Sequence, residues 1–132
     1  MLGEKFHDLT GKITGVRVLP GDVMETSFQG AIKVLGIDGT DIGTFTAVMQ
    51  PNGFIRGEGQ GISMMSNGES FTWRGQGVGK PTGKGLGASY RYGITMSVPP
   101  TSKLAKLNGV YGVGEFEVDE LGNVKGATWE WR

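Results

Sequence analysis

Apolar residues and glycines alternate with polar residues over most of the chain, and this alternation has the period of a β-strand. Residues 56–61 read Arg-Gly-Glu-Gly-Gln-Gly, and residues 74–79 read Arg-Gly-Gln-Gly-Val-Gly. Successive side chains of a strand point to opposite faces, so these strands carry almost no side chains on one face. The bare face must receive something bulky, either aromatic rings from adjacent strands or a ligand.

Turn signals rich in Pro, Gly, Asn and Asp divide the chain into eight candidate strands. The strands are expected near residues 13–19, 25–35, 42–50, 54–65, 69–79, 88–98, 110–119 and 124–131. One short helical turn is predicted near 101–108, where Leu104 and Leu107 are three residues apart. Evenly spaced strands with one short helix predict an all-β fold, a single eight-stranded antiparallel β-barrel. We expect one domain over residues 1–132, with residues 1–10 as a loose N-terminal segment.

Two turns that contain Asn-Gly determine the expected register at the centre of the sheet. Residues 51–53 and 66–68 are expected to form type I turns, each followed by a glycine bulge. The pairs expected from these turns are Phe45 with Gly59, Ala47 with Gly57 and Trp73 with Gly61. If either turn had two residues instead, Arg56, Glu58 and Gln60 would face inward and the barrel would have a polar interior.

Two further hairpins complete the expected register. Asp38-Gly39 fits a two-residue hairpin turn, and the last hairpin is expected around residues 120–123. The pairs expected from these two turns are Val34 with Gly43, Ile32 with Phe45, Trp129 with Gly114 and Trp131 with Gly112. Each ring of the last strand would then lie over a glycine, which is ordinary close packing in a tight barrel.

The expected register sorts the side chains into an apolar inward set and a polar outward set. Burial of one large apolar side chain is worth about 1.5–3 kcal/mol, so the apolar set belongs inside. The strand carboxylates are all placed in the outward set and are Glu58, Glu115, Glu117 and Glu130. Outward carboxylates beside arginines are usually weak surface ion pairs, so no catalytic residue is identified. The residues expected to line a pocket are Trp73, Tyr90, Tyr92, Trp129, Phe45 and Phe116.

Charge and composition exclude several classes of function. The chain has 13 basic and 13 acidic residues, so no attraction to nucleic acid or to an anionic membrane is expected. The absence of cysteine excludes disulfides, thiol nucleophiles and thiolate metal sites. The sequence shows neither a secretory signal nor an apolar stretch long enough to span a membrane. We therefore expect a cytoplasmic protein without membrane insertion.

Two glycine-rich segments are similar to nucleotide-binding motifs but lack the residues and the following helix that these motifs require. Residues 79–85 have Gly instead of Ser or Thr after Lys84 and precede a strand, which excludes a phosphate-binding loop. Residues 57–61 do not begin a helix, which excludes a dinucleotide-binding motif. His7 is the only histidine and is expected to be solvated in a polar N-terminal segment. No metal and no cofactor are therefore predicted.

Several segments along the chain form a recognisable pattern. In chain order they are Asp41-Ile42-Gly43-Thr44-Phe45, Gly57-Glu58-Gly59-Gln60-Gly61, Thr72-Trp73-Arg74-Gly75-Gln76-Gly77-Val78-Gly79, Leu107-Asn108-Gly109-Val110, and Glu117-Val118-Asp119-Glu120 with Trp129-Glu130-Trp131. Together they resemble a family of small uncharacterised prokaryotic proteins whose fold is similar to that of plant allene oxide cyclase, over about residues 11–132. The resemblance implies an eight-stranded antiparallel barrel, often self-associating, around an apolar interior. It does not imply the activity, because the polar site residues of the cyclase, including a glutamate, match no position here.

Three functions are compatible with these features. The first is a barrel that binds a small apolar or aromatic molecule in its interior. The second is a cyclase or isomerase that restricts the conformation of a reactive lipid-like substrate and excludes water, and an inward Glu58 or Glu115 would favour it. The third is a structural or oligomerisation module with a solid core. Outward apolar residues, among them Ile62, Met64 and Tyr111, predict a homo-oligomer.

Overall fold

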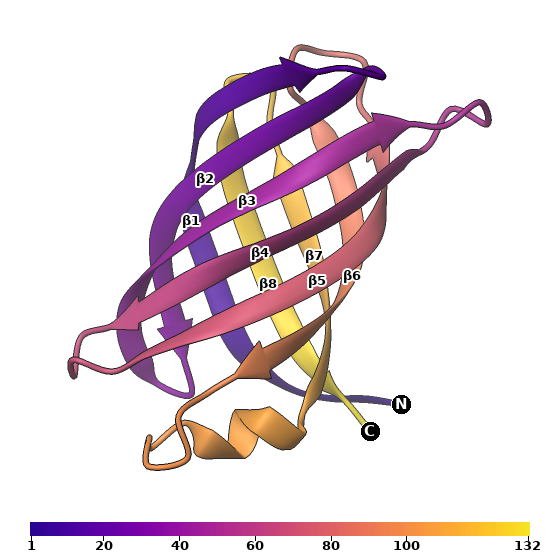
Figure 1. The fold of residues 1–132 in the computed structure, drawn as a ribbon. Coiled ribbons are helices and arrows are strands. Elements are labelled where there is room, and N and C mark those ends of the chain that lie inside the picture. Colours follow the sequence, from indigo (N-terminus) through magenta and orange to yellow (C-terminus); the bar gives the residue numbers. More distant parts are fainter.

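Eight antiparallel strands close into a barrel in which each strand pairs with its neighbours in sequence and β8 pairs with β1 (Figure 1). This computed structural model describes all residues from 1 to 132. The strands are β1 (Leu2–Leu19), β2 (Val23–Val34), β3 (Ile37–Met49), β4 (Ile55–Met65), β5 (Ser70–Pro81), β6 (Ala88–Ser97), β7 (Tyr111–Val118) and β8 (Asn123–Trp131). The 3-10 helix η1 (Ala105–Gly109) lies across one end of the barrel, where Leu104 and Leu107 pack into the core. The predicted all-β, eight-stranded antiparallel barrel with one short helical turn is confirmed.

The first strand begins at Leu2, so the structure differs from the prediction of a loose segment over residues 1–10. His7 pairs with Val34 on β2 and with Thr128 on β8. This double pairing closes the barrel, because without it β2 and β8 would be open sheet edges. The register is irregular near the start of β1 and interrupts the alternation of polar and apolar residues. This part of the strand therefore cannot be recognised from the sequence pattern.

The two Asn-Gly hairpins have the predicted bulged turns. Gly53 and Gly68 have φ values of 86° and 87°. Their N–H groups donate to the carbonyl oxygens of Gln50 and Met65 at 2.9 Å and 3.0 Å. The pairs Phe45 with Gly59, Ala47 with Gly57 and Trp73 with Gly61 are observed as predicted. Arg56 and its polar neighbours on β4 are exposed, which excludes the alternative with a polar interior on these strands.

The turn between β2 and β3 lies at Leu35-Gly36, not at Asp38-Gly39 as predicted. Both turn residues have positive φ, 49° and 82°, as a two-residue hairpin turn requires. The turn at this position pairs Val34 with Ile37 and lets Ile37 pack against the core. The predicted pairs Val34 with Gly43 and Ile32 with Phe45 are wrong, and the observed pairs are Phe28 with Gly43 and Thr26 with Phe45. Because the shift is an even number of residues, the inward and outward faces are unchanged.

The hairpin between β7 and β8 also has a bulged turn, which shifts β8 by one residue from the predicted register. Gly122 has a φ of 86°, and its N–H donates to the Asp119 carbonyl oxygen at 3.1 Å. The Asp119 carboxylate accepts hydrogen bonds from the N–H groups of Leu121 and Asn123, both at 2.9 Å. The observed pairs are Gly114 with Thr128 and Gly112 with Glu130, in place of the predicted pairs with Trp129 and Trp131. A shift of one residue exchanges the two faces of a strand, so both tryptophans lie on the outward face.

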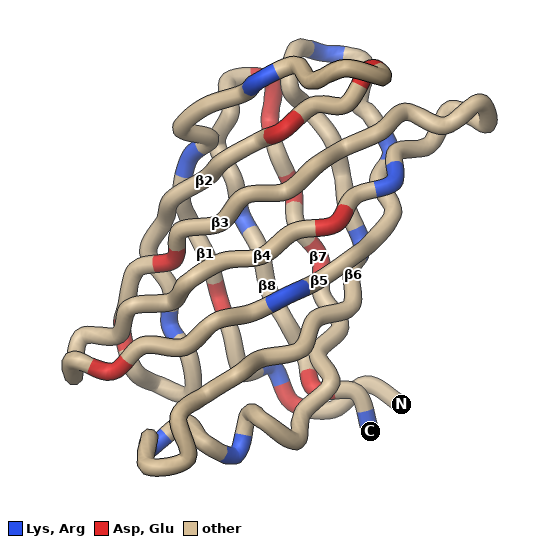
Figure 2. The backbone as a smooth tube through the Cα atoms, viewed as in Figure 1, with Lys and Arg blue, Asp and Glu red and all other residues tan.

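Charged residues lie mostly on the outer wall of the barrel. Figure 2 shows basic and acidic positions interspersed along the strands. Arg91 on β6 lies 2.9 Å from Glu117 and 3.8 Å from Glu115, both on β7. Exposed pairs of this kind are worth about 0–1 kcal/mol, so they contribute little to stability. None of the helical residues forms a segment with the length and hydropathy of a membrane-spanning helix.

Candidate ligand-binding site

A cavity of about 110 Å³ lies inside the barrel, next to the bare glycine faces of β4 and β5. Gly57, Gly59, Gly75 and Gly77 all border it. A Cβ atom at Gly57 would meet a single atom within 4 Å, the carbonyl oxygen of Thr46 at 3.3 Å. At this position the glycine repeat therefore leaves empty space instead of receiving a ring.

Five aromatic side chains form a connected group along the cavity, here called the ring cluster. Its members are Phe28, Phe45, Trp73, Tyr90 and Phe116. Neighbouring ring centroids are 5.1 to 6.3 Å apart, with Phe28 stacked on Trp73 and Phe45 edge-to-face with Tyr90. A Cβ atom at Gly61 would overlap the indole of Trp73, so this glycine is required where the ring lies on the backbone. The repeats thus accommodate rings at some glycines and a cavity at others.

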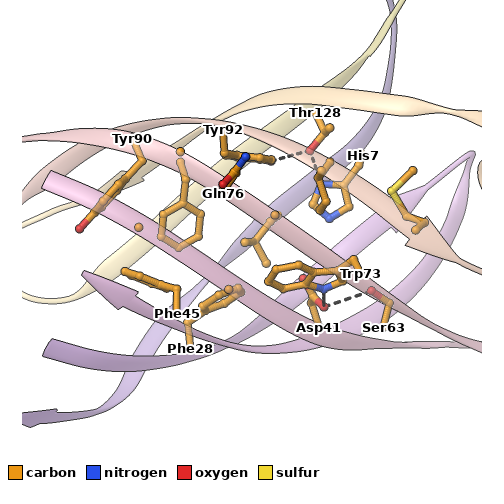
Figure 3. A pocket seen from close by; sticks show the side chains of 18 of the residues that line it. His7, Phe28, Asp41, Phe45, Ser63, Trp73, Gln76, Tyr90, Tyr92 and Thr128 are labelled. Atoms are coloured by element: carbon orange, nitrogen blue, oxygen red, sulfur yellow. Dashed lines mark hydrogen bonds between the residues drawn. The ribbon is translucent and has the colours of Figure 1, made fainter. Parts of the chain in front are cut away.

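A buried carboxyl group lies at one end of the ring cluster (Figure 3). Asp41 on β3 is 3% exposed. Its Oδ1 atom accepts hydrogen bonds from Trp73 Nε1 on β5 at 2.9 Å and from Ser63 Oγ on β4 at 3.1 Å. Burial raises the pKa of Asp41, and the hydrogen bonds from Trp73 and Ser63 oppose this increase. Asp41 belongs to none of the ion pairs in the structure, so the cavity contains an acidic group without a basic partner.

A second polar cluster comes from β1, β6 and β8. The Tyr92 hydroxyl lies 2.5 Å from Thr128 Oγ1, which lies 3.2 Å from His7 Nδ1 (Figure 3). Burial lowers the pKa of His7 to about 4, although the negative charge of Asp8 acts in the opposite direction. Burial also raises the pKa of Tyr92 to about 12. Both groups are therefore uncharged at neutral pH, and the prediction of a solvated His7 is wrong because β1 carries its ring into the barrel.

The structure brings together all but one of the residues that the sequence predicts for the pocket. Those that border the cavity are Phe45, Trp73, Tyr90, Tyr92 and Phe116. Trp129 does not border it, because the one-residue shift of β8 turns its side chain to the outer face. Thr128 occupies the inward position instead and is 1% exposed.

Sequence reasoning missed Asp41, His7 and Thr128 as residues of the site. Asp41 has a usable signal, because it is two residues before Gly43 and four before Phe45 and so shares their inward face. With the turn predicted at Asp38-Gly39, the strand is expected to begin after Asp41. The inward position of Asp41 is therefore not recognised from the sequence. The other two residues depend on the pairing of β1 and on the register of β8, which no local pattern reveals.

The geometry defines what the site can do chemically. The walls are largely apolar, and one buried acidic group, Asp41, and one neutral imidazole, His7, lie among the cavity-lining residues, whereas Glu58 borders the cavity but is exposed to solvent. No group of three or more His, Cys, Asp and Glu side chains is placed to hold a metal ion. The arrangement can therefore enclose a small apolar molecule, orient it by hydrogen bonds and exchange a proton with it.

No protein-family model and no curated protein matches the sequence. A solved structure of a conserved protein of unknown function from Rhodopseudomonas palustris is 16% identical, with a TM-score of 0.80 over 99% of this chain and 98% of that chain. A protein of unknown function from Clostridium acetobutylicum is 11% identical, with a TM-score of 0.82 over 98% and 97%. A β-barrel-like protein from Acinetobacter baumannii is 12% identical, with a TM-score of 0.79 over 99% and 96%. At these identities the similarity shows the barrel fold alone.

Proposed function

We propose that this protein binds a small, mostly apolar molecule, aromatic or of similar shape, in the cavity of the barrel. The observation that carries the proposal is a cavity bordered by the ring cluster and by two hydrogen-bonded polar clusters. Apolar walls with a few fixed polar groups are typical of small-molecule sites. A structural module with a solid core fits less well, because protein interiors are normally packed without voids of this size.

The volume of the cavity limits the size of the ligand. In another protein, an apolar cavity of roughly 150 Å³ binds benzene. The cavity of about 110 Å³ therefore suits a single ring or a short branched chain, and a larger ligand requires side chains to move. Such a ligand would lie against the ring cluster and reach Asp41 or Tyr92 with a polar atom.

Tryptophan fluorescence tests the proposal, because Trp73 is the only tryptophan that borders the cavity. Replacing Trp129 and Trp131 by Phe leaves Trp73 as the single reporter. We expect titration with toluene, benzyl alcohol or cyclohexanol to change the emission of Trp73 and to raise the midpoint of thermal unfolding. If neither quantity changes across a broad panel of compounds of this size, the proposal is wrong.

A pair of matched glycine variants separates binding inside the barrel from binding outside it. Gly57→Val places two methyl groups into the cavity, where its Cβ atom would meet only the carbonyl oxygen of Thr46 at 3.3 Å, and we expect it to weaken binding at least tenfold. Gly15→Val is the control, because Gly15 is exposed on β1 and a Cβ atom there meets nothing within 4 Å. Equal affinity in both variants would place any bound ligand elsewhere on the protein.

A cyclase or isomerase that acts on a reactive lipid-like substrate is the second candidate. The carboxylates expected to favour it are not buried in the cavity, because Glu58 borders it but is exposed to solvent and Glu115 lies by Arg91 on the outer wall. Asp41 supplies an inward carboxyl group with a raised pKa, a property common among catalytic acids and bases. The resemblance to proteins with an allene-oxide-cyclase-like fold agrees with this candidate at the level of fold alone.

Product analysis tests this second candidate. If the protein restricts the conformation of a reactive lipid-like substrate, the cyclised product should be enriched in one enantiomer relative to the product of the uncatalysed reaction. We expect Asp41→Asn to reduce this enrichment while toluene still binds. Racemic products with the unaltered protein would exclude the candidate, and unchanged enrichment in the variant would exclude a role for Asp41.

We also propose that the barrel self-associates through outward apolar residues. Ile42 and Ile62 are cross-strand partners on β3 and β4, and they are 43% and 50% exposed. Exposed apolar neighbours of this kind are frequent at protein interfaces. Analytical ultracentrifugation should find an oligomer that Ile62→Lys dissociates, and a monomer at high concentration of the unaltered protein would contradict the proposal.

A further inference from the structure

We propose that the cavity selects a small organic cation, an aromatic or alkyl amine whose ammonium group pairs with Asp41 while its apolar part lies against the ring cluster. This inference rests on the proposed function, because it specifies the chemistry of the molecule held in the barrel. Three features of the site favour such a ligand: the charge of the cavity, the oxygen of Asp41 to which no side chain donates, and the rings beside it.

The charge of the cavity favours a cation. Asp41 is the only charged residue that is buried in the structure. No Lys or Arg lines the cavity, and Glu58, which borders it, is exposed to solvent. The other titratable groups that face the cavity are His7, Tyr90 and Tyr92, and all three are neutral at pH 7, because burial lowers the pKa of His7 and raises those of the tyrosines. A ligand with one positive charge would therefore complement the site.

The hydrogen bonds of Asp41 favour its ionised form over the acid. Both side-chain donors, Trp73 Nε1 and Ser63 Oγ, are directed at the same oxygen, Oδ1, and the backbone N–H of Ile42 also hydrogen-bonds the carboxyl group. Donors directed at a carboxyl group stabilise the carboxylate, so they partly offset the cost of burying it. The second oxygen, Oδ2, accepts no hydrogen bond from a side chain. An ammonium group, which has three donors and no acceptor, would complete this site.

The ring cluster supplies surroundings that suit an amine. The indole of Trp73 carries the N–H that binds Asp41, and the ring of Phe28 is stacked on it with the centroids 6.1 Å apart. The indole directs its N–H edge at Asp41, so the rings serve as apolar walls for the body of the ligand while the carboxyl group faces its charge. In Figure 3, Phe28, Phe45 and Tyr90 gather at one end of the view, whereas Asp41 and Ser63 lie at the other end. A molecule with an apolar body and one cationic end would match this distribution.

Three probes of nearly equal shape test the inference, namely benzylamine, benzyl alcohol and toluene. Their affinities would be measured by calorimetry and by ligand-observed NMR on the full chain and on Asp41→Asn. We expect the unaltered protein to bind benzylamine at least tenfold more tightly than benzyl alcohol. Asp41→Asn should abolish this preference and keep its affinity for toluene, which also demonstrates that the variant is folded.

The outcomes distinguish this inference from the function on which it rests. If toluene or benzyl alcohol binds the unaltered protein and benzylamine binds no more tightly, the cavity is a ligand site but the selection of a cation is wrong. The same conclusion follows if Asp41→Asn keeps the preference for benzylamine. If none of the three probes binds, the proposed function fails as well.

A pH series on the unaltered protein gives a further test. Binding of an ammonium group requires ionised Asp41, so the affinity for benzylamine should rise as the pH increases through the raised pKa of this carboxyl group. The increase should end where the amine loses its own proton. Protonated His7, which lines the same cavity and has a pKa of about 4, would also repel an ammonium group, so the series is repeated on His7→Asn with toluene as the uncharged control. An affinity ratio of benzylamine to toluene that does not change with pH would overturn the inference.

Discussion

The indole of Trp73 on β5 crosses strand β4 and donates its N–H to the carboxyl group of Asp41 on β3 at 2.9 Å. The crossing depends on Gly61, the direct partner of Trp73 on β4, because the ring lies on the bare backbone of this glycine. One glycine of the repeats therefore controls both the packing of the ring cluster and the hydrogen bonding of the buried acid.

Gly61→Ala should be strongly destabilising. The added Cβ atom would overlap the indole of Trp73, and inserting atoms into a packed core usually costs about 1–3 kcal/mol. Urea unfolding should show a loss of this size in the free energy of unfolding. The emission of Trp73 should also shift to longer wavelength, because a displaced indole loses its contacts and its hydrogen bond to Asp41.

Gly57→Ala is the matched control for this prediction, since it makes the same substitution on the same face of the same strand. Its Cβ atom would enter the cavity and meet only the carbonyl oxygen of Thr46 at 3.3 Å. Alanine also loses less conformational entropy on folding than glycine, so we expect the free energy of unfolding to change by less than about 1 kcal/mol. Equal losses in Gly57→Ala and Gly61→Ala would contradict the cavity.

The stability of the barrel should fall between pH 6.5 and pH 4 because of His7. Its pKa is about 4 in the folded protein and 6.5 in the unfolded chain, so over this range the unfolded chain binds a proton that the folded protein does not. The free energy of unfolding should decrease by up to about 3 kcal/mol as the pH falls from 8 to 4. Denaturant unfolding as a function of pH measures this decrease.

His7→Asn isolates this effect, because Asn can keep a hydrogen bond to Thr128 but does not titrate. Asp41 acts in the opposite sense: its pKa is raised in the folded protein, so falling pH favours folding through this group. Since both proteins contain Asp41, the difference between their pH profiles reports His7 alone. Parallel profiles would show that His7 is exposed to solvent.

Fluorescence quenching should distinguish the three tryptophans by their faces. In the observed register of β8, Trp129 and Trp131 face outward, and Trp131 is 55% exposed. Iodide should therefore quench a variant that keeps only Trp131 much more strongly than a variant that keeps only Trp73. Equal protection of the two residues would support the alternative register, in which Trp131 lies over Gly112 inside the barrel.

Much of the fold could be predicted because two kinds of local signal agree. The alternation of apolar and polar residues identifies the faces of the strands, and the glycines of the turns at Asn52-Gly53 and Asn67-Gly68 adopt the positive φ that a bulged turn needs. The same chemistry is present at Gly122, where Asp119 also binds two backbone N–H groups. A bulged turn between β7 and β8, like the turns of the two Asn-Gly hairpins, predicts the observed register and places Trp129 outside.

The polar residues of the site could not be predicted in the same way. Thr128 faces inward only because of the one-residue shift of β8, and a single error of register exchanges the faces of a whole strand. His7 enters the barrel because β1 pairs on both sides, which depends on the closure of the complete sheet. Asp41 lies beside Trp73 only because the indole spans a strand, a contact between residues 32 positions apart in the sequence.

The corrected turn between β2 and β3 predicts that Gly36→Ala is destabilising for backbone reasons alone. Gly36 has a φ of 82°, and a Cβ atom there would meet nothing within 4 Å, so the cost is the left-handed conformation, about 1–2 kcal/mol. Gly15→Ala is the control, because its Cβ atom also has free space but Gly15 lacks a positive φ, and we expect it to be neutral or slightly stabilising. Urea unfolding of both variants measures the difference. If the two variants are equally stable, the turn does not lie at Leu35-Gly36, and the pairing of Phe28 with Gly43, on which the ring cluster depends, would also be wrong.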